Sequence, residues 1–424
     1  MNLNSLPVFR RPNPLMLLGC VVVLGLLQTN VCDGQRRLDE PPIDYRTTDA
    51  DNPVSDLADK VNSGEIRLEY EPGFGYLRSI LEELEIPISS QALVFSKTSL
   101  QTGRIEPKNP RAFYFNDDVY VGWIRGSSLM EVATADPKLG AVFYSIQMQP
   151  RGASIRREHH RCLVCHEKTT DSGKVPLHTI TSVMTRDDGQ VNLLLAEFET
   201  DHTSPFEERW GGWYVTGHSE LMKHMGNAFL EGDALVPMQP AFFDRLDHAF
   251  DTRHWPAATS DIAALMVLEH QVEMHNRMTN ANYAVRRSEY LSDAGKRDDE
   301  AHHQQINQAA KSIVEYLLFS GEAKLPSPVT TSSPFADEFA QRGPFDSQGR
   351  SLRQFDLQTR LFKYPCSYLV YSEQFQQLEP ELLKRVKGQL RAILEGDNQD
   401  AAFEHLTAAD REAILNILVE TKVL

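Results

Sequence analysis

Cysteine is scarce in this chain, with only five among 424 residues. Cys20 and Cys32 fall near the N-terminus and Cys162 and Cys165 belong to one motif, which leaves Cys366 alone. One spare thiol cannot make a disulfide framework. The aromatic and apolar neighbours of Cys366 favour a buried, inert thiol. With 41% hydrophobic residues, the chain is instead expected to fold around hydrophobic cores, as a globular protein of two or three domains.

Positive charge is also in short supply. The 43 Lys and Arg residues are outnumbered by 59 Asp and Glu residues, which gives a net charge of −16 at pH 7. This balance argues against a nucleic-acid-binding protein and against binding to an anionic membrane surface. A net negative charge would attract a basic redox partner protein, and it would equally increase solubility.

The apolar run near the N-terminus is too short to cross a bilayer. It covers residues 15–27, a length of 13 residues, whereas a membrane-spanning helix needs about 20. Arg10 and Arg11 precede the run and polar residues follow it, which is the order of a secretory signal. We therefore assign residues 1–34 to a signal segment and expect a periplasmic or exported protein. It would not be an integral membrane protein once processed, and an uncleaved segment would remain as an anchor.

The most informative feature present is the motif formed by residues 162–166, with the sequence Cys-Leu-Val-Cys-His. Cys-x-x-Cys-His is the arrangement that attaches haem covalently to a protein. Two thiols in one helical turn can each add to a vinyl group of the porphyrin, and the adjacent histidine can bind the iron. The motif predicts one covalent haem c, attached through Cys162 and Cys165, with His166 as the proximal ligand of the iron.

Two other uses of a Cys-x-x-Cys pair are weaker. A structural zinc site needs four ligands, and no second Cys-x-x-Cys or His-x-x-x-His lies nearby. A thioredoxin-like redox pair usually follows a buried strand, whereas residues 156–161 are charged or polar. Haem attachment remains the favoured interpretation.

The hydrophobic pattern predicts an α+β fold with three parts. Short apolar runs between turn residues predict an antiparallel meander at residues 92–96, 112–115, 119–124, 129–133 and 141–148, after a helix at residues 75–86. A strand at residues 191–198 is expected to return to the same sheet. From residue 261 the period becomes helical, with helices at residues 296–319, 380–394 and 408–419 after an all-round apolar first helix. Thr407 and Asp410 resemble a capping box at the start of the last helix.

These patterns divide the chain into four segments. They are the signal segment, a β-rich N-terminal domain at residues 35–150, a haem-binding segment at 151–258 and a helical C-terminal domain at 259–424.

The sixth ligand of the iron decides what the haem does, since a filled position relays electrons and an open one binds small molecules. His224 is the distal candidate. Competing candidates are Met184, His218, Met222, Met225, His270 and His275. Each histidine is individually more consistent with a hydrogen-bonded core residue. Together with Glu269 and Glu273, the histidines could form either a distal haem pocket or a separate metal site.

The motif resembles that of c-type cytochromes, without a departure at Cys162, Cys165 or His166. In addition, residues 210–217, 265–283 and 356–371 resemble segments of large exported bacterial proteins that carry a single such motif. The resemblance implies an exported mono-haem c-type cytochrome that transfers electrons to a redox partner protein. The alternative is a peroxidase-like haem oxidoreductase with an open distal site, in which His224 or His270 would act as acid and base.

Overall fold

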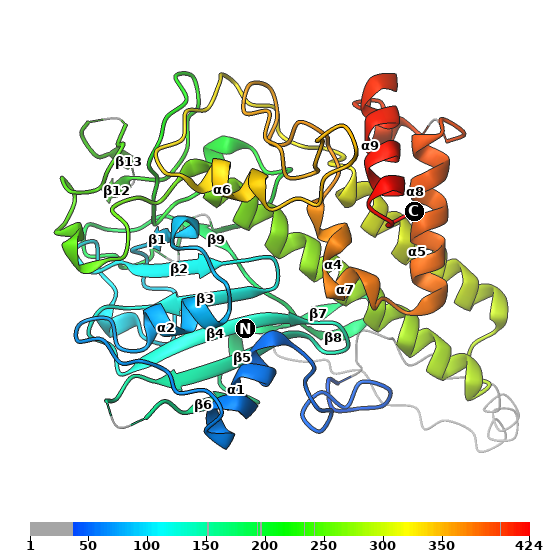
Figure 1. Cartoon of the computed structure of the whole chain (residues 1–424), viewed down its shortest axis with the longest axis horizontal. Coiled ribbons are helices and arrows are strands. Elements are labelled where there is room, and N and C mark those ends of the chain that lie inside the picture. Colours follow the sequence, from blue (N-terminus) through cyan, green and yellow to red (C-terminus); the bar gives the residue numbers. More distant parts are fainter. Residues whose placement is uncertain are drawn as a thin grey trace, which may run out of the picture.

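The computed structural model describes residues 37–150, 152–192, 194–195, 197–232, 234–240, 242–398 and 400–424. The signal segment assigned to residues 1–34 lies outside this described part of the chain. The predicted α+β class is confirmed: a seven-stranded antiparallel sheet occupies one side of the molecule and helices gather on the other, as Figure 1 shows.

The sheet contains the predicted meander. Its order is β11-β1-β2-β3-β4-β5-β6, and every described pairing is antiparallel. The five consecutive strands are β1 (Ala92–Val94), β2 (Arg111–Phe115), β3 (Val119–Trp123), β4 (Leu129–Asp136) and β5 (Gly140–Gln147). The edges are β6 (Ile155–Arg157) and β11 (Trp213–Tyr214).

The expected return of residues 191–198 to this sheet is wrong. The described part of that stretch contributes to β10 (Glu197–Glu199), which pairs with β9 (Thr181–Val183) in a separate two-stranded sheet. Glu197 and Glu199 are exposed on either side of Phe198, a pattern that suits a surface ribbon. The strand that pairs with β1 is β11, whose two aromatic residues are both buried.

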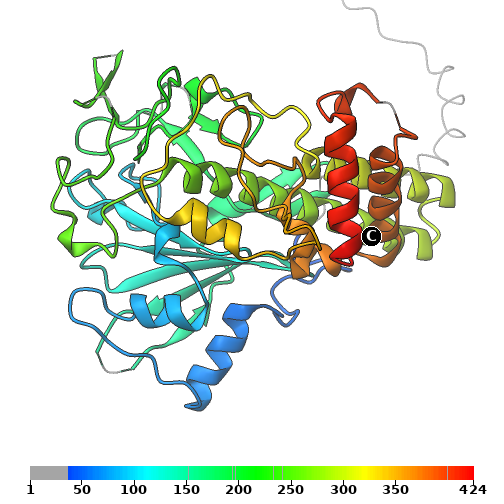
Figure 2. The same cartoon turned by 45° about the horizontal axis from the view of Figure 1, so that its top comes forward.

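Both faces of the sheet are covered, by different helices. On one face, α1 (Pro53–Ser63) and α2 (Leu77–Glu83) share a hydrophobic cluster with alternate strand residues such as Leu93 and Val121. On the other face, α4 (Ile262–Asp293) packs with Phe115 and Tyr120. Figure 2 shows α1 and α2 below the sheet and α4 above it.

The middle segment, residues 151–258, contributes to both hydrophobic clusters. Trp213 and Val215 join the cluster around α4, and Leu163 and Val175 join the cluster of the opposite face. The same segment supplies β6 and β11, the two edge strands of the sheet. The described part of this segment is therefore packed into the sheet and the helical layer.

The long helix α4 connects the sheet to the C-terminal helices. Asp261 caps its N-terminus by accepting from the Ala263 N–H at 2.8 Å, and most of its 32 residues are buried, as the all-round apolar pattern predicts. Helix α5 (Asp299–Leu317) packs directly against it, as do the shorter α6 (Phe335–Gln341) and α7 (Glu373–Gln376). Helix α8 (Pro380–Leu394) packs on α5, and α9 (Ala408–Glu420) packs on α8.

The C-terminal half of α4 holds the turn between β4 and β5. Asn282 Nδ2, the Tyr283 hydroxyl and Arg286 donate to three successive turn carbonyls at 3.1, 2.9 and 2.6 Å. The turn approaches so closely that a Cβ on Gly140 would lie 2.2 Å from the side chain of Thr279, and Gly140 has a φ of +72°. Only glycine meets both conditions without strain.

The predicted capping box of the last helix is confirmed. Thr407 Oγ1 accepts from the Asp410 N–H at 3.0 Å, and Asp410 accepts from the Thr407 N–H at 3.1 Å. We expect Thr407→Ala to lower the free energy of unfolding by about 1 kcal/mol, since the Asp410 N–H loses its hydrogen-bond acceptor. Urea denaturation followed by circular dichroism would measure this. Thr102→Ala, in an exposed 3-10 turn with no side-chain cap, is a control that should show little change.

Candidate haem-attachment site

The motif forms a single turn of helix, α3 (Leu163–His166), between β6 and β7 (Glu167–Thr170). The N–H groups of Cys165 and His166 both donate to the Cys162 carbonyl, at 3.2 and 3.1 Å. Leu163 is buried in the hydrophobic cluster, while Val164 is 83% exposed and Cys165 is exposed. One side of the turn is thus anchored in the protein and the other presents a thiol and an apolar side chain to the surface.

The imidazole of His166 is held through one nitrogen. His166 Nδ1 lies 2.9 Å from the Leu177 carbonyl oxygen. Since a carbonyl can only accept, Nδ1 carries the hydrogen and Nε2 of the neutral ring keeps a free lone pair. Burial lowers the pKa of His166, which favours the neutral ring. This is the tautomer and protonation state that a metal-binding histidine requires.

A hairpin delivers the acceptor for His166. Strands β7 and β8 (Gly173–Pro176) pair in register, and the Leu177 N–H donates to the His166 carbonyl at 2.9 Å. His166 and Leu177 are therefore facing residues at the open end of the hairpin, joined by one backbone and one side-chain hydrogen bond. The ten residues between them in sequence bring the acceptor back to the motif.

Helix α4 in turn holds the hairpin. Asn276 accepts from the His178 N–H at 2.9 Å and donates to the His178 carbonyl at 3.0 Å. Asn280 accepts from the Ser172 hydroxyl at 3.0 Å, and Arg287 donates to the Lys174 carbonyl at 2.9 Å. These three α4 side chains hold both the turn and the open end of the hairpin, so the orientation of His166 depends on α4.

The two cysteines have different surroundings. Cys162 is partly buried against the hydrophobic cluster, and burial raises the pKa of its thiol to about 12. At neutral pH this thiol is protonated, so it is a poor redox nucleophile, unlike the low-pKa cysteine of a thioredoxin-like pair. Cys165 is exposed, and no disulfide joins the two.

The residues present fit a covalently attached haem. Two thiols on one helical turn, an exposed apolar residue between them, and an adjacent neutral histidine with a free Nε2 are the groups that attachment needs. The ring of Phe143 on β5 lies 4.5 Å from that of His166, so the proximal histidine rests on the sheet.

His224, the distal candidate, is held by its own loop. Its Nδ1 accepts from the Gly226 N–H at 3.1 Å, and its ring meets the edge of Trp210 at 5.1 Å. Burial lowers the pKa of His224 to about 4. None of its contacts in the described part of the chain is with a motif residue.

The other candidates also have separate partners. His270 Nδ1 lies 2.8 Å from His202 Nδ1, whereas His275 contacts Gln374 and the Asp117 carbonyl. The backbone of His218 pairs with Thr330. Glu269 pairs with Arg209 and Glu273 with Arg277. Within the described residues, no group of three or more His, Cys, Asp or Glu side chains could hold a metal ion, so the separate metal site considered for this set is not formed there.

The three candidate methionines and Trp213 differ in burial and in their partners. Met222 and Met225 are buried, and the sulfur of Met225 accepts a hydrogen bond from Ser182 at 3.6 Å. Met184 is half-buried. Trp213 donates from Nε1 to the Thr181 carbonyl at 2.9 Å and forms part of β11.

Several residues around His166 could not be identified from the sequence. Leu177 acts through its carbonyl, which no side-chain pattern reveals, and Phe143 resembles any other strand residue. His178 is buried, and its Nε2 has no hydrogen-bond partner among the described residues. The residues Asp171, Ser172 and Gly173 are an ordinary turn signal and could have revealed the hairpin.

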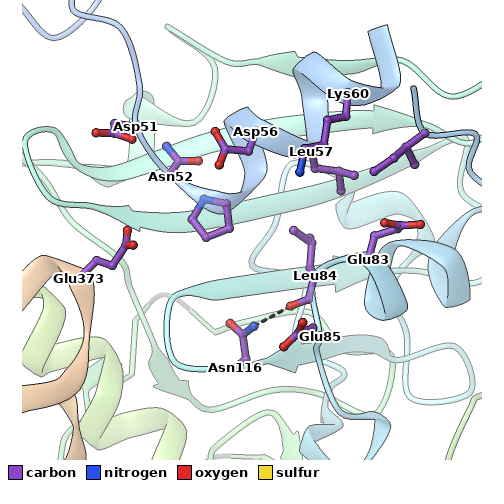
Figure 3. Close-up of a pocket in the computed structure, with 12 residues that line it drawn as sticks. Asp51, Asn52, Asp56, Leu57, Lys60, Glu83, Leu84, Glu85, Asn116 and Glu373 are labelled. Atoms are coloured by element: carbon purple, nitrogen blue, oxygen red, sulfur yellow. Dashed lines mark hydrogen bonds between the residues drawn. The ribbon is translucent and has the colours of Figure 1, made fainter. Parts of the chain in front are cut away.

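A separate cleft lies away from the motif, between α1, α2 and Glu373 (Figure 3). Its volume is about 420 Å³, and five carboxylates and one cation line it: Asp51, Asp56, Glu83, Glu85 and Glu373, with Lys60. None of the motif residues lines this cleft. Its net negative charge has the same sign as that of the haem propionates and would repel them, so the cleft does not suit them.

Comparison with known proteins leaves the site to be judged on its geometry. No family model matches the chain, and no curated protein or solved structure is significantly similar to it. Among the described helices, none has the length and apolar character needed to cross a bilayer.

Proposed function

We propose that this protein is an exported mono-haem c-type cytochrome that transfers electrons through a covalently attached haem. One observation carries the proposal: the 2.9 Å hydrogen bond from His166 to the Leu177 carbonyl, next to the two cysteines of the motif. It fixes the tautomer that leaves Nε2 for iron. The two neighbouring cysteines distinguish His166 from an ordinary hydrogen-bonded core histidine.

Each part of the site has a role in this proposal. When bound, haem supplies a one-electron couple between ferric and ferrous iron. Cys162 and Cys165 hold the porphyrin covalently, and His166 binds the iron in an orientation set by the hairpin. Phe143 supports the ring of His166 from the sheet.

The proposal also includes the location and the partner. Covalent haem attachment in bacteria takes place outside the inner membrane, and residues 1–34 have the pattern of a secretory signal. A net charge of −16 favours a basic redox partner protein, since opposite charges accelerate the encounter.

Haem staining after denaturing electrophoresis tests the attachment. We expect the wild-type protein, produced together with the haem-attachment machinery, to carry one covalent haem per chain. Cys162→Ala/Cys165→Ala should lose it entirely, because no thioether can form. Cys366→Ala is the matched control and should retain full staining, since Cys366 is fully buried elsewhere. A stained band in the double variant, or none in the wild type, would contradict the proposal.

The same preparation distinguishes the peroxidase-like alternative. For an electron-transfer protein with both axial positions filled, carbon monoxide should leave the absorption spectrum of the ferrous protein unchanged. A rapid spectral shift would show an open position and favour the haem oxidoreductase.

A further inference from the structure

The sheet face beside the motif is only partly covered. Phe143, which contacts His166, lies opposite Ala133 in the register of β4 and β5, and Glu131 shares the face two residues earlier. Glu131 and Ala133 are half-buried, whereas Met130 and Val132 between them are buried on the opposite face. A strip of sheet next to His166 is therefore only partly covered.

One arginine lies across this strip. Arg111 starts on β2 and its guanidinium covers Gly122 of β3, where a Cβ would lie 2.4 Å from Nη2. The guanidinium pairs with Glu131 on β4 and lies 4.2 Å from the centre of the Phe113 ring. It therefore lies over β3 and β4, while Phe143 is on the next strand, β5, two residues further along the register.

Arg111 has a donor to spare. Its side chain is 14% exposed, yet its Nε–H is buried without an acceptor among the described residues. A buried guanidinium normally uses more of its five N–H groups.

The other cations near the motif are less suitable. Lys168 and Lys174 are each more than a third exposed and pair with Glu199 and Glu167. Arg156 and Arg161 are exposed. Arg111 alone among these five combines a mostly buried guanidinium with an unused donor.

We propose that Arg111 binds a propionate of the attached haem, with Glu131 holding the guanidinium over Gly122. This rests on the proposed haem attachment. Arginine forms paired hydrogen bonds with carboxylates, and a partly covered site strengthens them. Arg111 is thus a positioning residue that sets the charge around the haem.

Potentiometric titration of the holoprotein tests this role. In Arg111→Gln we expect covalent haem to be retained and its midpoint potential to fall, because a positive charge beside the haem is lost. The potential should also become more dependent on pH between about 5 and 8, because a carboxyl without its cation titrates closer to neutrality. Arg156→Gln, on the neighbouring edge strand, removes the same charge from an exposed position where water and salt screen it. This matched control should lower the midpoint potential much less and leave its pH dependence unchanged.

Glu131→Gln is a second variant with the opposite expectation. It frees the guanidinium from its carboxylate and should raise the midpoint potential. If Arg111→Gln does not fold, as judged by circular dichroism, an unchanged midpoint in Glu131→Gln overturns the proposal. If the wild-type protein carries haem, but Arg111→Gln has the same midpoint potential and pH dependence as Arg156→Gln, the role of Arg111 is overturned. The proposed haem attachment is not affected by that result. Wild-type protein without covalent haem overturns the proposed function as well.

Discussion

Arg209→Met should lower the free energy of unfolding by about 3 to 5 kcal/mol, because it leaves a buried carboxyl without its partner. Arg209 and Glu269 are 2% and 1% exposed, and Nη1 lies 3.2 Å from Oε2. Arg209 also donates to the carbonyls of Ser204 and His202 at 2.6 and 3.0 Å. The pair links the segment that precedes β11 to α4, so its loss should loosen the middle segment.

Chemical denaturation at pH 7.5 measures this effect. Burial raises the pKa of Glu269 to about 7, against the influence of Arg209, so the carboxyl left alone is expected to take up a proton. The double variant Arg209→Met/Glu269→Met should recover part of the loss. Arg253→Met, which breaks the exposed pair with Asp251, should cause no measurable change. A wild-type midpoint for Arg209→Met would refute the importance of the buried pair.

Acid should destabilise the protein through His202 and His270. Their rings are nearly parallel, at 14° to each other, with the two Nδ1 atoms 2.8 Å apart, and Phe319 stacks on both. In this hydrogen bond one Nδ1 carries a hydrogen and the other must be unprotonated to accept it. The two Nδ1 atoms therefore cannot both carry a proton while the contact is kept. Burial is the main cause that holds the pKa of both well below 6.5, and Arg209 acts in the same direction on His202.

The sign of the pH effect follows from this depression of the pKa. In the unfolded chain both histidines bind a proton below about pH 6.5, whereas in the folded protein they stay neutral. Above about pH 6.5 the two histidines therefore do not lower the free energy of unfolding. At lower pH this free energy decreases by about 1.4 kcal/mol per pH unit for each histidine. Raised pKa values at Glu269 and Asp118 act in the opposite direction, so the comparison must be made between variants.

Denaturation at pH 7.5 and 5.5 makes that comparison. From pH 7.5 to pH 5.5, His270→Gln should lose about 1.4 kcal/mol less unfolding free energy than the wild type. The difference arises in the one pH unit between 6.5 and 5.5. His303→Gln removes an exposed histidine and should follow the wild type. Equal slopes for His270→Gln and the wild type would mean that His270 is protonated in the folded protein.

The local pattern of the sequence predicts most of the secondary structure. The meander from β1 to β5, the buried helix α4 and the capping box at Thr407 all depend on neighbouring residues, so their period and caps can be recognised. The error at residues 191–198 has a different origin. Which strand pairs with β1 depends on a contact between Leu93 and Tyr214, which are far apart in the chain.

The candidate site divides in the same way. Cys162, Cys165 and His166 are recognisable because a single helical turn brings them together, and that turn is present in the structure. The distal side was not predictable, since a ligand can come from any distant segment. The sequence offers His224 as the distal candidate with His218, His270 and His275 as competitors, and the structure gives each of the four a different partner.

The sequence by itself determined the Cys-x-x-Cys-His motif, the α+β class and the near absence of cysteine outside that motif. These properties depend on residue type and on spacing within a turn or a strand. Only the tertiary structure decided which carbonyl orients His166, that α4 holds the hairpin carrying it, and that Arg111 lies across the partly covered strip of sheet. The physical reason is that these contacts join backbone groups and side chains from separate elements, and packing alone brings such elements together.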